Sequence, residues 1–537
     1  MNYNPLFCLE FKTNTIMENA LCILFLIPIA SFLLAGVVPN KLCNLNLLVN
    51  LTRITSLLAA IISMVGAMWL FNFGMVESKL IGIYDLGFLI RIDAVGLIMF
   101  SMISIIAIVV LRFSYNYLDG DPNQAKFISE LALTIGLVQL LVLSGNLFGL
   151  FIAWVFTSLV LNKLILFYPN RKKARIAARK KFIVARLGDL SLLIALSLIY
   201  IEIGSGNLSV IFEELKRTPL HGVSMSLEVA AVFLVLTAGL KSAQIPFHGW
   251  LIEVMESPTP VSALLHAGLL NAGPFLMIRF AFLLDTVSIA PVFLFILGAI
   301  TALYGALVFT TQPNVKTSLA YSSVAHMGFS MMVCGLGVYA ASLLHLIAHS
   351  FFKAHSFLSS GSMVEKAITK DASAYSRKGN VGRMIIGFAI SIALFFLIAS
   401  FWGVTTSSEY QLLIIGGVVF LGVLNLVINA VDSYNFYSSI LKIMGATVLV
   451  LMSFFGLEEL IRYTLGAQIP PIAKPSELMM FLSATMLIVF FITVLIHLLS
   501  PLLKKGTFYL KLGVHVRNGF YLNLILDRIT RSNYKRI

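Results

Sequence analysis

The stretch that decides the fold reads KSAQIPFHGWLIEVMESPTPVSALLHAG and covers residues 241–268. Its first residue, Lys241, ends the apolar run EVAAVFLVLTAGL, and Pro246 follows five residues later. A proline inside a helix removes a backbone donor and breaks the helix, which a protein in lipid tolerates only in its interior. The stretch therefore predicts a membrane helix that is interrupted next to a positive charge.

Apolar segments of membrane-spanning length recur on both sides of this stretch. Of the 537 residues, 59% are hydrophobic and 12% are charged, and the mean hydropathy is +0.95. A soluble domain is about half apolar and about a quarter charged. Because only helices and closed barrels satisfy their backbone in lipid, we expect an all-α polytopic membrane protein with about 14–15 transmembrane helices. The expected spans are 20–38, 54–73, 95–113, 127–145, 147–168, 182–203, 227–247, 259–284, 287–309, 318–338, 339–361, 384–402, 411–430, 436–456 and 478–499.

The net charge of +14 is concentrated in three basic clusters, at 171–181, in the linker from Lys366 to Arg383 and in the tail after Pro501. An even number of expected spans separates them, so all three face one side, which the positive-inside rule makes the cytoplasm. The segment 457–477 then lies outside. We interpret the clusters as topology anchors rather than as contacts to nucleic acid, and docking of a cytoplasmic partner is the alternative interpretation.

The sequence contains neither a soluble domain nor a cofactor motif. No GxGxxG follows a strand, no phosphate-binding loop occurs, and the four cysteines lack metal-ligand spacing. The first span lacks the features of a cleaved signal peptide, and Met17 is an alternative start. We therefore expect a chain that is not an enzyme and has no cofactor of its own.

Ionisable side chains inside the expected spans are the candidate functional residues. A charge at mid-bilayer costs about 2.5–3.5 kcal/mol and usually marks an ion path. Lys241, beside the expected break, is a candidate to load and release a proton, and the alternative is that it extends to the membrane surface. In VARLGDLSLL, Asp189 lies one helix turn from Arg186 and pairs either with it or with Lys241.

A second group of candidates follows helical spacing in HLIAHSFFKAHSF. His345, His349 and Lys353 are four residues apart and share one helix face, whereas His355 points elsewhere. Imidazole donates and accepts protons and titrates near pH 6.5, so the stripe predicts proton transfer by way of water. Hydrogen bonds between helices and a metal site are the alternatives.

His266 is the third candidate, in SPTPVSALLHAG. Pro258 and Pro260 are placed as the first residues of a helix, and His266 follows inside it. A structural hydrogen bond is the alternative role. We expect His266 to connect Lys241 with the stripe.

The stretch 241–268 resembles the signature of the antiporter-like subunits of respiratory complex I and of Mrp-type cation/proton antiporters. The resemblance extends to YSSVAHMGF (321–329) and HLIAHSFFKAHSFLSSGS (345–362), and it covers most of the chain from about 85 to 430. It implies two inverted five-helix repeats, each with a broken helix, and a polar axis across the membrane centre.

Carried over to this sequence, Lys241 resembles the central lysine of that family. The family's connecting residues correspond to His266, His345, His349 and Lys353. The repeats divide the chain into five segments. They are the N-terminal transmembrane helices (1–126), the first repeat (127–284), the second repeat (285–435), the C-terminal transmembrane helices (436–499) and a basic cytoplasmic tail (500–537).

Two departures from the complex I pattern concern charged residues. In complex I subunits a glutamate follows the tryptophan of the fifth helix and pairs with the central lysine, but here Trp154 is followed by Val155. The region of the second broken helix, IASFWGVTTSSEY (398–410), contains no lysine. We expect Asp189 to supply the missing counter-charge.

With these departures, AWVFTSLVLNKLILFYP and the segment that follows it resemble the membrane subunit of DAB-type inorganic carbon pumps. The resemblance implies a large peripheral cytoplasmic partner that binds zinc and resembles β-carbonic anhydrases. It also implies a chain in the bacterial inner membrane that uses a proton or sodium gradient to make this partner hydrate CO2 and accumulate bicarbonate. The alternative is a proton- or sodium-translocating subunit of a respiratory NADH dehydrogenase or Mrp-type complex, and a third reading is a non-conducting membrane anchor.

Overall fold

A computed structural model of the chain describes residues 5–37, 44–217, 223–361, 381–405, 409–431, 436–498 and 507–529. The regular secondary structure of this part of the chain is helical apart from two small antiparallel strand pairs. Ten of its helices are long and apolar enough to cross a membrane. The prediction of an all-α polytopic membrane protein is confirmed, and each expected span falls largely on a helix.

The chain forms two compact units. The first contains residues 1–290, 346–358 and 523–537, and the second contains residues 291–345 and 359–522. Helix α15 (Tyr339–Leu358) is continuous, and its first seven residues belong to the second unit. The five segments expected from the sequence were defined by repeats, whereas these two units are defined by their compactness. The two units therefore do not test the five-segment division, which stays a prediction.

The first unit begins with helices whose amino ends are fixed by side chains. Asn44, Asp93 and Asn146 each accept a hydrogen bond from a backbone N–H in the first turn of α2, α3 and α5, which satisfies a donor that the helix leaves unpaired. The helices of this unit are α1 (Pro5–Val37), α2 (Leu45–Phe73), α3 (Ala94–Tyr117), α4 (Gln124–Val142), α5 (Leu147–Ile165), α6 (Lys172–Ile203), α7 (Leu208–Arg217), α8 (Met225–Lys241), α9 (Gly249–Glu253), η1 (Val254–Glu256), α10 (Thr259–Leu264), the π-helix η2 (Leu265–Leu269), α11 (Ala272–Arg279), α12 (Ala281–Thr286) and α23 (Asn523–Ile529).

The four short strands lie between α2 and α3 and were not predicted. Strand β1 (Val76–Glu77) pairs with β4 (Arg91–Ile92), and β2 (Ile81–Ile83) pairs with β3 (Leu86–Phe88). Strands of two or three residues are too short to show an alternating pattern in the sequence.

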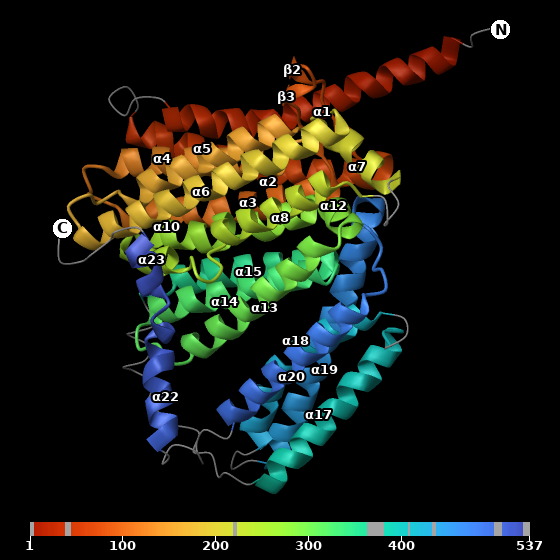
Figure 1. Cartoon of the computed structure of the whole chain (residues 1–537). Helices are drawn as coiled ribbons and strands as arrows, with labels where there is room; N and C mark the ends of the chain where they lie inside the picture. The colour runs from red at the N-terminus through yellow and green to blue at the C-terminus, as the bar shows by residue number, and fades with distance from the viewer. Residues whose placement is uncertain are drawn as a thin grey trace. The chain divides into compact units, whose positions relative to one another are not determined.

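Helix α6 lies between α5 and α8 and packs along both (Figure 1). The Ser191 hydroxyl donates to the Phe233 carbonyl at 2.8 Å, and Gly188 faces the backbone carbonyl of Thr237. Small residues at this contact allow the two helices to approach closely. Side chains of α5, α6 and α8 therefore meet inside the first unit.

The predicted break beside Lys241 is confirmed. Helix α8 ends at Lys241, residues 242–248 are not helical, and α9 resumes at Gly249. The Ser242 hydroxyl donates to the Leu270 carbonyl at 2.8 Å, which ties the break to the next helix. Gly273 makes this possible, because a Cβ there would lie 2.1 Å from the Ser242 hydroxyl oxygen.

The second unit has its own apolar core. Phe395, Phe420 and Phe455 are buried in it, and the rings of Phe395 and Phe420 lie 5.3 Å apart. Besides part of α15, its helices are α13 (Ile289–Phe309), α14 (Val315–Gly335), α17 (Val381–Phe401), α18 (Tyr410–Val431), α19 (Phe436–Leu465), η3 (Gly466–Gln468), α20 (Glu477–Leu498), α22 (Thr507–Arg517) and η4 (Gly519–Tyr521). Most of the basic linker from Lys366 to Arg383 lies outside the described residues.

Candidate functional site

Lys241 lies at the carboxyl end of α8, against a tryptophan of α5. Its Nζ is 4.4 Å from the centre of the Trp154 ring, and Trp154 is 1% exposed. Within the described chain, this nitrogen is shielded from solvent and has no hydrogen-bond partner. An ammonium over an indole face is stabilised by the negative potential of the ring. The alternative that Lys241 extends to the membrane surface is therefore wrong.

Asp189 is buried on α6, and both partners considered for it are near. Its Oδ2 lies 2.6 Å from Nη2 of Arg186, three residues earlier. The carboxylate also attracts the Lys241 ammonium electrostatically. Asp189 is thus shared between Arg186 and Lys241, and its role as counter-charge of the lysine stays a prediction.

Two lysines of the first basic cluster are buried, which a pure topology signal does not require. Lys180 is 1% exposed and forms ion pairs with Glu253 and Asp527. Lys181 is 4% exposed and donates to the Ser158 carbonyl and, at 3.1 Å, to the Ser158 hydroxyl. The interpretation of this cluster as a topology signal stays a prediction, and these two lysines have structural contacts besides, because α6 begins at Lys172 and carries them inside.

Lys181 and Lys241 line one small cavity of about 20 Å³, which is roughly enough for one water molecule. Ser158, Trp250 and Leu265 line it as well. The indole Nε1 of Trp250 has no hydrogen-bond partner among the residues that the structure describes. Four of its lining residues, Ser158, Lys181, Lys241 and Trp250, carry a polar group in the side chain.

Lys181 was missed from the sequence because it was grouped with its charged neighbours. A signal was present: Lys181 and Asp189 are eight residues apart and so share one face of a helix. Likewise Trp154 and Ser158 are four residues apart on α5. Both pairs meet where α5, α6 and α8 converge.

His266 lies in the π-helix η2, next to the cavity residue Leu265. It is fully buried, and in the described chain neither ring nitrogen has a hydrogen-bond partner. Its ring stacks on Phe357 of α15, with centroids 4.4 Å apart and planes 17° apart. Lys353, also fully buried, lies near enough to interact with it electrostatically. A structural hydrogen bond to a described residue is therefore not its role.

The predicted stripe is present on α15. His349 and Lys353 are buried in the first unit, and His355 is exposed, as expected. His345 belongs to the second unit, where its Nε2 lies 3.2 Å from Nδ1 of His326 on α14. His326 was not singled out from the sequence, although it lies in the quoted motif YSSVAHMGF. The first unit thus brings Lys241 together with Asp189, and His266 with Lys353.

The comparison with protein families matches most of these residues to one domain. Residues 144–403 match the family described as "NADH:quinone oxidoreductase/Mrp antiporter, TM". Residues 80–128 match "NADH-Ubiquinone oxidoreductase (complex I), chain 5 N-terminus". All the predicted site residues lie within the first of these matches.

Individual relatives narrow this broad family to a smaller group of proteins. The chain is 37% identical over 445 residues to the probable inorganic carbon transporter subunit DabB2 of Halothiobacillus neapolitanus, which covers 82% of this chain and 79% of that protein. It is 40% identical over 282 residues to the probable inorganic carbon transporter subunit DabB of Hydrogenovibrio crunogenus, covering 52% and 54%. NADH-ubiquinone oxidoreductase chain 5 of Metridium senile is 37% identical over 289 residues, covering 54% and 47%.

A solved structure supports the fold. The structure of the Mrp complex from Dietzia sp. contains a chain that aligns with 96% of this chain, and the alignment covers 60% of the Dietzia chain. The TM-score is 0.59 and the sequence identity is 21%. The relatives are named as transporter subunits, in agreement with the prediction that the chain is not itself an enzyme. It is a multi-pass membrane protein, which in bacteria resides in the inner membrane, and an ion-conducting subunit of an energy-coupled complex. The chain belongs to the family of DabB inorganic carbon transporter subunits, within the antiporter-like membrane subunits related to complex I and Mrp complexes.

Proposed function

We propose that this chain conducts protons down their gradient through Lys241 and its neighbours, and that this flow drives the accumulation of inorganic carbon. The observation that carries the proposal is the placement of the Lys241 ammonium over Trp154, beside a water-sized cavity and within reach of Asp189. A buried lysine in such a place exchanges protons with water when the cavity is hydrated.

The lining of the cavity favours protons over sodium. Its two ionisable side chains, Lys181 and Lys241, are both cationic when protonated. A metal cation needs oxygen ligands and would be repelled by two ammonium groups, whereas a lysine takes up a proton without needing a further ligand. His266, His349 and Lys353 extend the set of proton-carrying groups within the first unit.

The proton gradient supplies enough free energy for a pump. One charge that moves down the membrane field releases about 2.3 kcal/mol per 100 mV. Each factor of ten in concentration requires about 1.4 kcal/mol. One or two protons per cycle would therefore sustain a roughly tenfold to thousandfold accumulation of bicarbonate.

The chemistry on carbon belongs to a partner in this proposal. The relatives named above are subunits, which implies further chains. We propose a large peripheral cytoplasmic subunit that binds zinc, resembles β-carbonic anhydrases and hydrates CO2. Proton flow through this chain would bias the partner's site between two states, so that hydration proceeds in one direction.

Inorganic carbon uptake in cells that lack carbonic anhydrase tests the proposal. The chain is expressed with and without a candidate for the large soluble partner proposed above, and a protonophore is added midway. Lys241→Ala should lower uptake by at least about a hundredfold, the effect expected for a proton-transfer group, with normal amounts of the complex. The matched control is Lys163→Ala, which changes an exposed lysine on the neighbouring helix α5.

Uptake that requires both chains and collapses with the protonophore would support a gradient-driven carbon pump. Undiminished uptake by Lys241→Ala would refute the role of the lysine.

The respiratory relatives favour a second candidate, a proton- or sodium-translocating subunit of a respiratory or Mrp-type complex. That function would show no carbon uptake but a cation flux linked to pH or sodium.

A further inference from the structure

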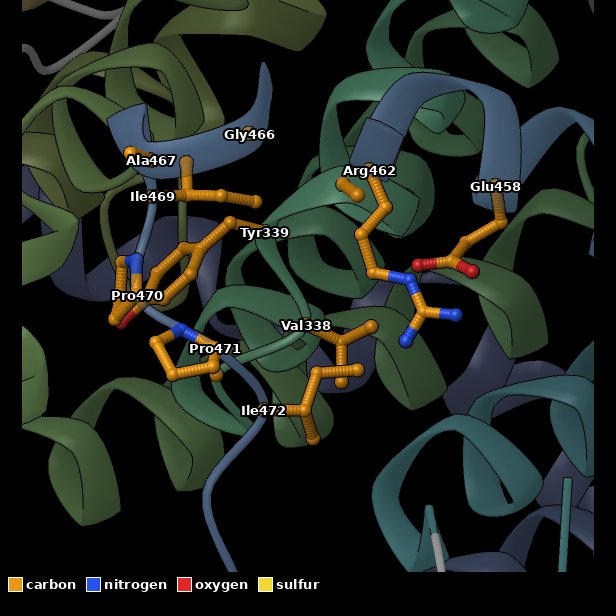
Figure 2. Close-up of a pocket in the computed structure, with 12 residues that line it drawn as sticks. Val338, Tyr339, Glu458, Arg462, Gly466, Ala467, Ile469, Pro470, Pro471 and Ile472 are labelled. Carbon is orange, nitrogen blue, oxygen red and sulfur yellow. The ribbon is translucent and has the colours of Figure 1, made fainter. Parts of the chain in front are cut away.

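The second unit contains a cavity of about 320 Å³ that is separate from the residues described above. Tyr339 of α15, Glu458 and Arg462 of α19, and Pro470 and Pro471 of the link to α20 line it (Figure 2). Apart from Glu458, Arg462 and the phenol of Tyr339, the lining residues are glycine, proline or aliphatic. A cavity of this size has room for several water molecules.

Glu458 is the unusual group in this cavity. It is 1% exposed, and its Oε1 has no hydrogen-bond partner among the residues that the structure describes. Figure 2 shows Glu458 and Arg462 side by side on α19, with their charged ends turned toward one another. Burying a carboxyl group without full hydrogen bonding costs free energy, so such groups are usually kept for a function.

The charge around Glu458 determines which ligand it suits. Arg462 Nη1 lies 2.5 Å from Oε1 of Glu409, and the same guanidinium forms an ion pair with Glu459. Glu458 interacts with the same guanidinium electrostatically, without forming a direct ion pair with it, so one guanidinium faces three carboxylates. This surplus of negative charge attracts cations and repels anions such as bicarbonate.

The cavity lies at the outer end of α19. Helix α20 is the span that connects the link 469–476 to the basic tail after Pro501. The positive-inside rule places that tail in the cytoplasm, so the link and the adjacent cavity face the outside. Glu458 lies seven residues before the end of α19, which is about two helix turns inside it.

We propose that this cavity takes up monovalent cations, protons in the first place, from the outer side and that Glu458 is the group that receives them. A hydronium ion gives its proton to Glu458 Oε1, which forms an O–H bond and leaves one water molecule. The proposal rests on the function proposed above and deepens it by naming where protons are loaded in the second unit. The region of the second expected broken helix, 398–410, provides no lysine for this purpose.

Dicyclohexylcarbodiimide tests the site without measuring transport. The reagent enters apolar cavities and reacts with protonated carboxyl groups there, to give a stable acylurea on the side chain. The full chain is labelled in membrane vesicles, and modified peptides are identified by mass spectrometry. The exposed Glu477, on the same side, is the comparison within the chain.

We expect Glu458 to be labelled at least about tenfold faster than Glu477, because burial favours the protonated form of a carboxyl group. The rate should fall as the pH rises, and Glu458→Gln should remove the label. Slower labelling in the presence of sodium at fixed pH would identify a site that also takes sodium, and no effect of sodium would identify a proton site. Failure of Glu458 to label in the folded wild-type chain at any pH would overturn the proposal.

Carbon uptake then separates this inference from the proposed function. Glu458→Gln should lower protonophore-sensitive uptake by at least about tenfold, and the control Glu477→Gln by less than about twofold. Normal uptake by Glu458→Gln, in cells where the wild-type pump is gradient-driven, would refute the loading role and leave the proposed function intact. If the wild type shows no gradient-driven uptake, the proposed function fails, but the labelling still decides whether the cavity holds protons.

Discussion

The ammonium nitrogen of Lys241, at the end of α8, lies 4.4 Å from the centre of the ring of Trp154 on α5. The residue after Trp154 is Val155, so the glutamate that the resemblance to complex I subunits implies at this place is missing. An indole ring stabilises an ammonium group but cannot accept its proton. A proton that leaves Lys241 must therefore pass to another group, and the cavity shared with Lys181 is one place where it can be received.

Replacing the ring should weaken conduction without unfolding the chain. A desolvated cation–π contact contributes about 1–2 kcal/mol, so Trp154→Leu should lower proton-driven carbon uptake by about fivefold to thirtyfold. Trp154→Phe keeps an aromatic face and should retain most of the uptake. The control is Phe156→Leu, two residues along α5, because Phe156 is 49% exposed and should tolerate the change. Equal uptake by Trp154→Leu and wild type would show that the ring does not hold the charge.

Lys181 should act with Lys241 rather than as a topology signal. Its Nζ donates to Ser158, and both residues line the cavity beside Lys241. Lys181→Gln keeps a hydrogen-bond donor but removes the titratable group, so we expect at least about a tenfold loss of proton flux into vesicles with the complex still assembled. Flux is followed with a pH-sensitive dye inside the vesicles.

The matched control for Lys181 is Lys173→Gln on the same helix. Lys173 pairs with Glu256 at 3.1 Å, and both side chains are largely exposed. Exposed ion pairs contribute less than about 1 kcal/mol, so this variant should conduct normally. A topology role predicts the reverse for Lys181→Gln, namely inverted or lost insertion, which protease accessibility of the tail would reveal.

The membrane helices could be predicted from the sequence because their signal is long and local. An apolar run of about 20 residues has few alternatives in lipid, and the break at Pro246 follows from the chemistry of proline. The strands between α2 and α3 and the extension of α6 back to Lys172 could not be predicted in the same way. Both depend on which neighbouring helices cover these residues, and that information is not local.

The candidate site was predictable where it follows a long motif and not where it depends on packing. Lys241, His266 and Lys353 lie in quoted motifs and are all placed in the interior of the first unit. The partners of these residues were not predicted: Trp154 under the lysine and Phe357 under His266. A buried aromatic residue in an apolar helix has no sequence feature that distinguishes a cation's partner from an ordinary core residue.

Asp93 anchors a buried ion cluster that we expect to stabilise the first unit without taking part in conduction. Its carboxylate pairs with Arg91 at 2.7 Å and with Arg279, and it also caps α3. Burial by itself raises the pKa of Asp93, but the Arg279 and Arg91 guanidinium groups outweigh this effect and hold the pKa at about 2. The carboxylate therefore contributes stability above its unfolded pKa of about 3.9, and this contribution is lost as the pH falls toward 2.

Arg279→Ala should lower the free energy of unfolding by about 3–5 kcal/mol, because it leaves a buried carboxylate with fewer partners. Thermal unfolding of the detergent-solubilised complex measures the change. The control Glu213→Gln breaks an exposed pair with Lys216 and should shift stability by less than about 0.5 kcal/mol. A shift for Arg279→Ala no larger than this control would contradict the structural role.

The C-terminal helix α23 should be held in the first unit by Lys180. This buried ammonium forms ion pairs with Asp527 of α23 and with Glu253 of α9. In Asp527→Asn, Glu253 remains as a carboxylate partner of Lys180, so we expect the free energy that holds α23 in place to fall by about 1–2 kcal/mol. Lys180→Met leaves two carboxylates without their cation and should lower this free energy by about 3–5 kcal/mol. Because both changes act on one contact, the double variant should lose less than the sum of the two.

Protease added to the cytoplasmic side measures the release of α23, and each 1.4 kcal/mol should raise cleavage near residue 523 about tenfold. Additive losses, or unchanged cleavage in Asp527→Asn, would show that another contact fixes this helix.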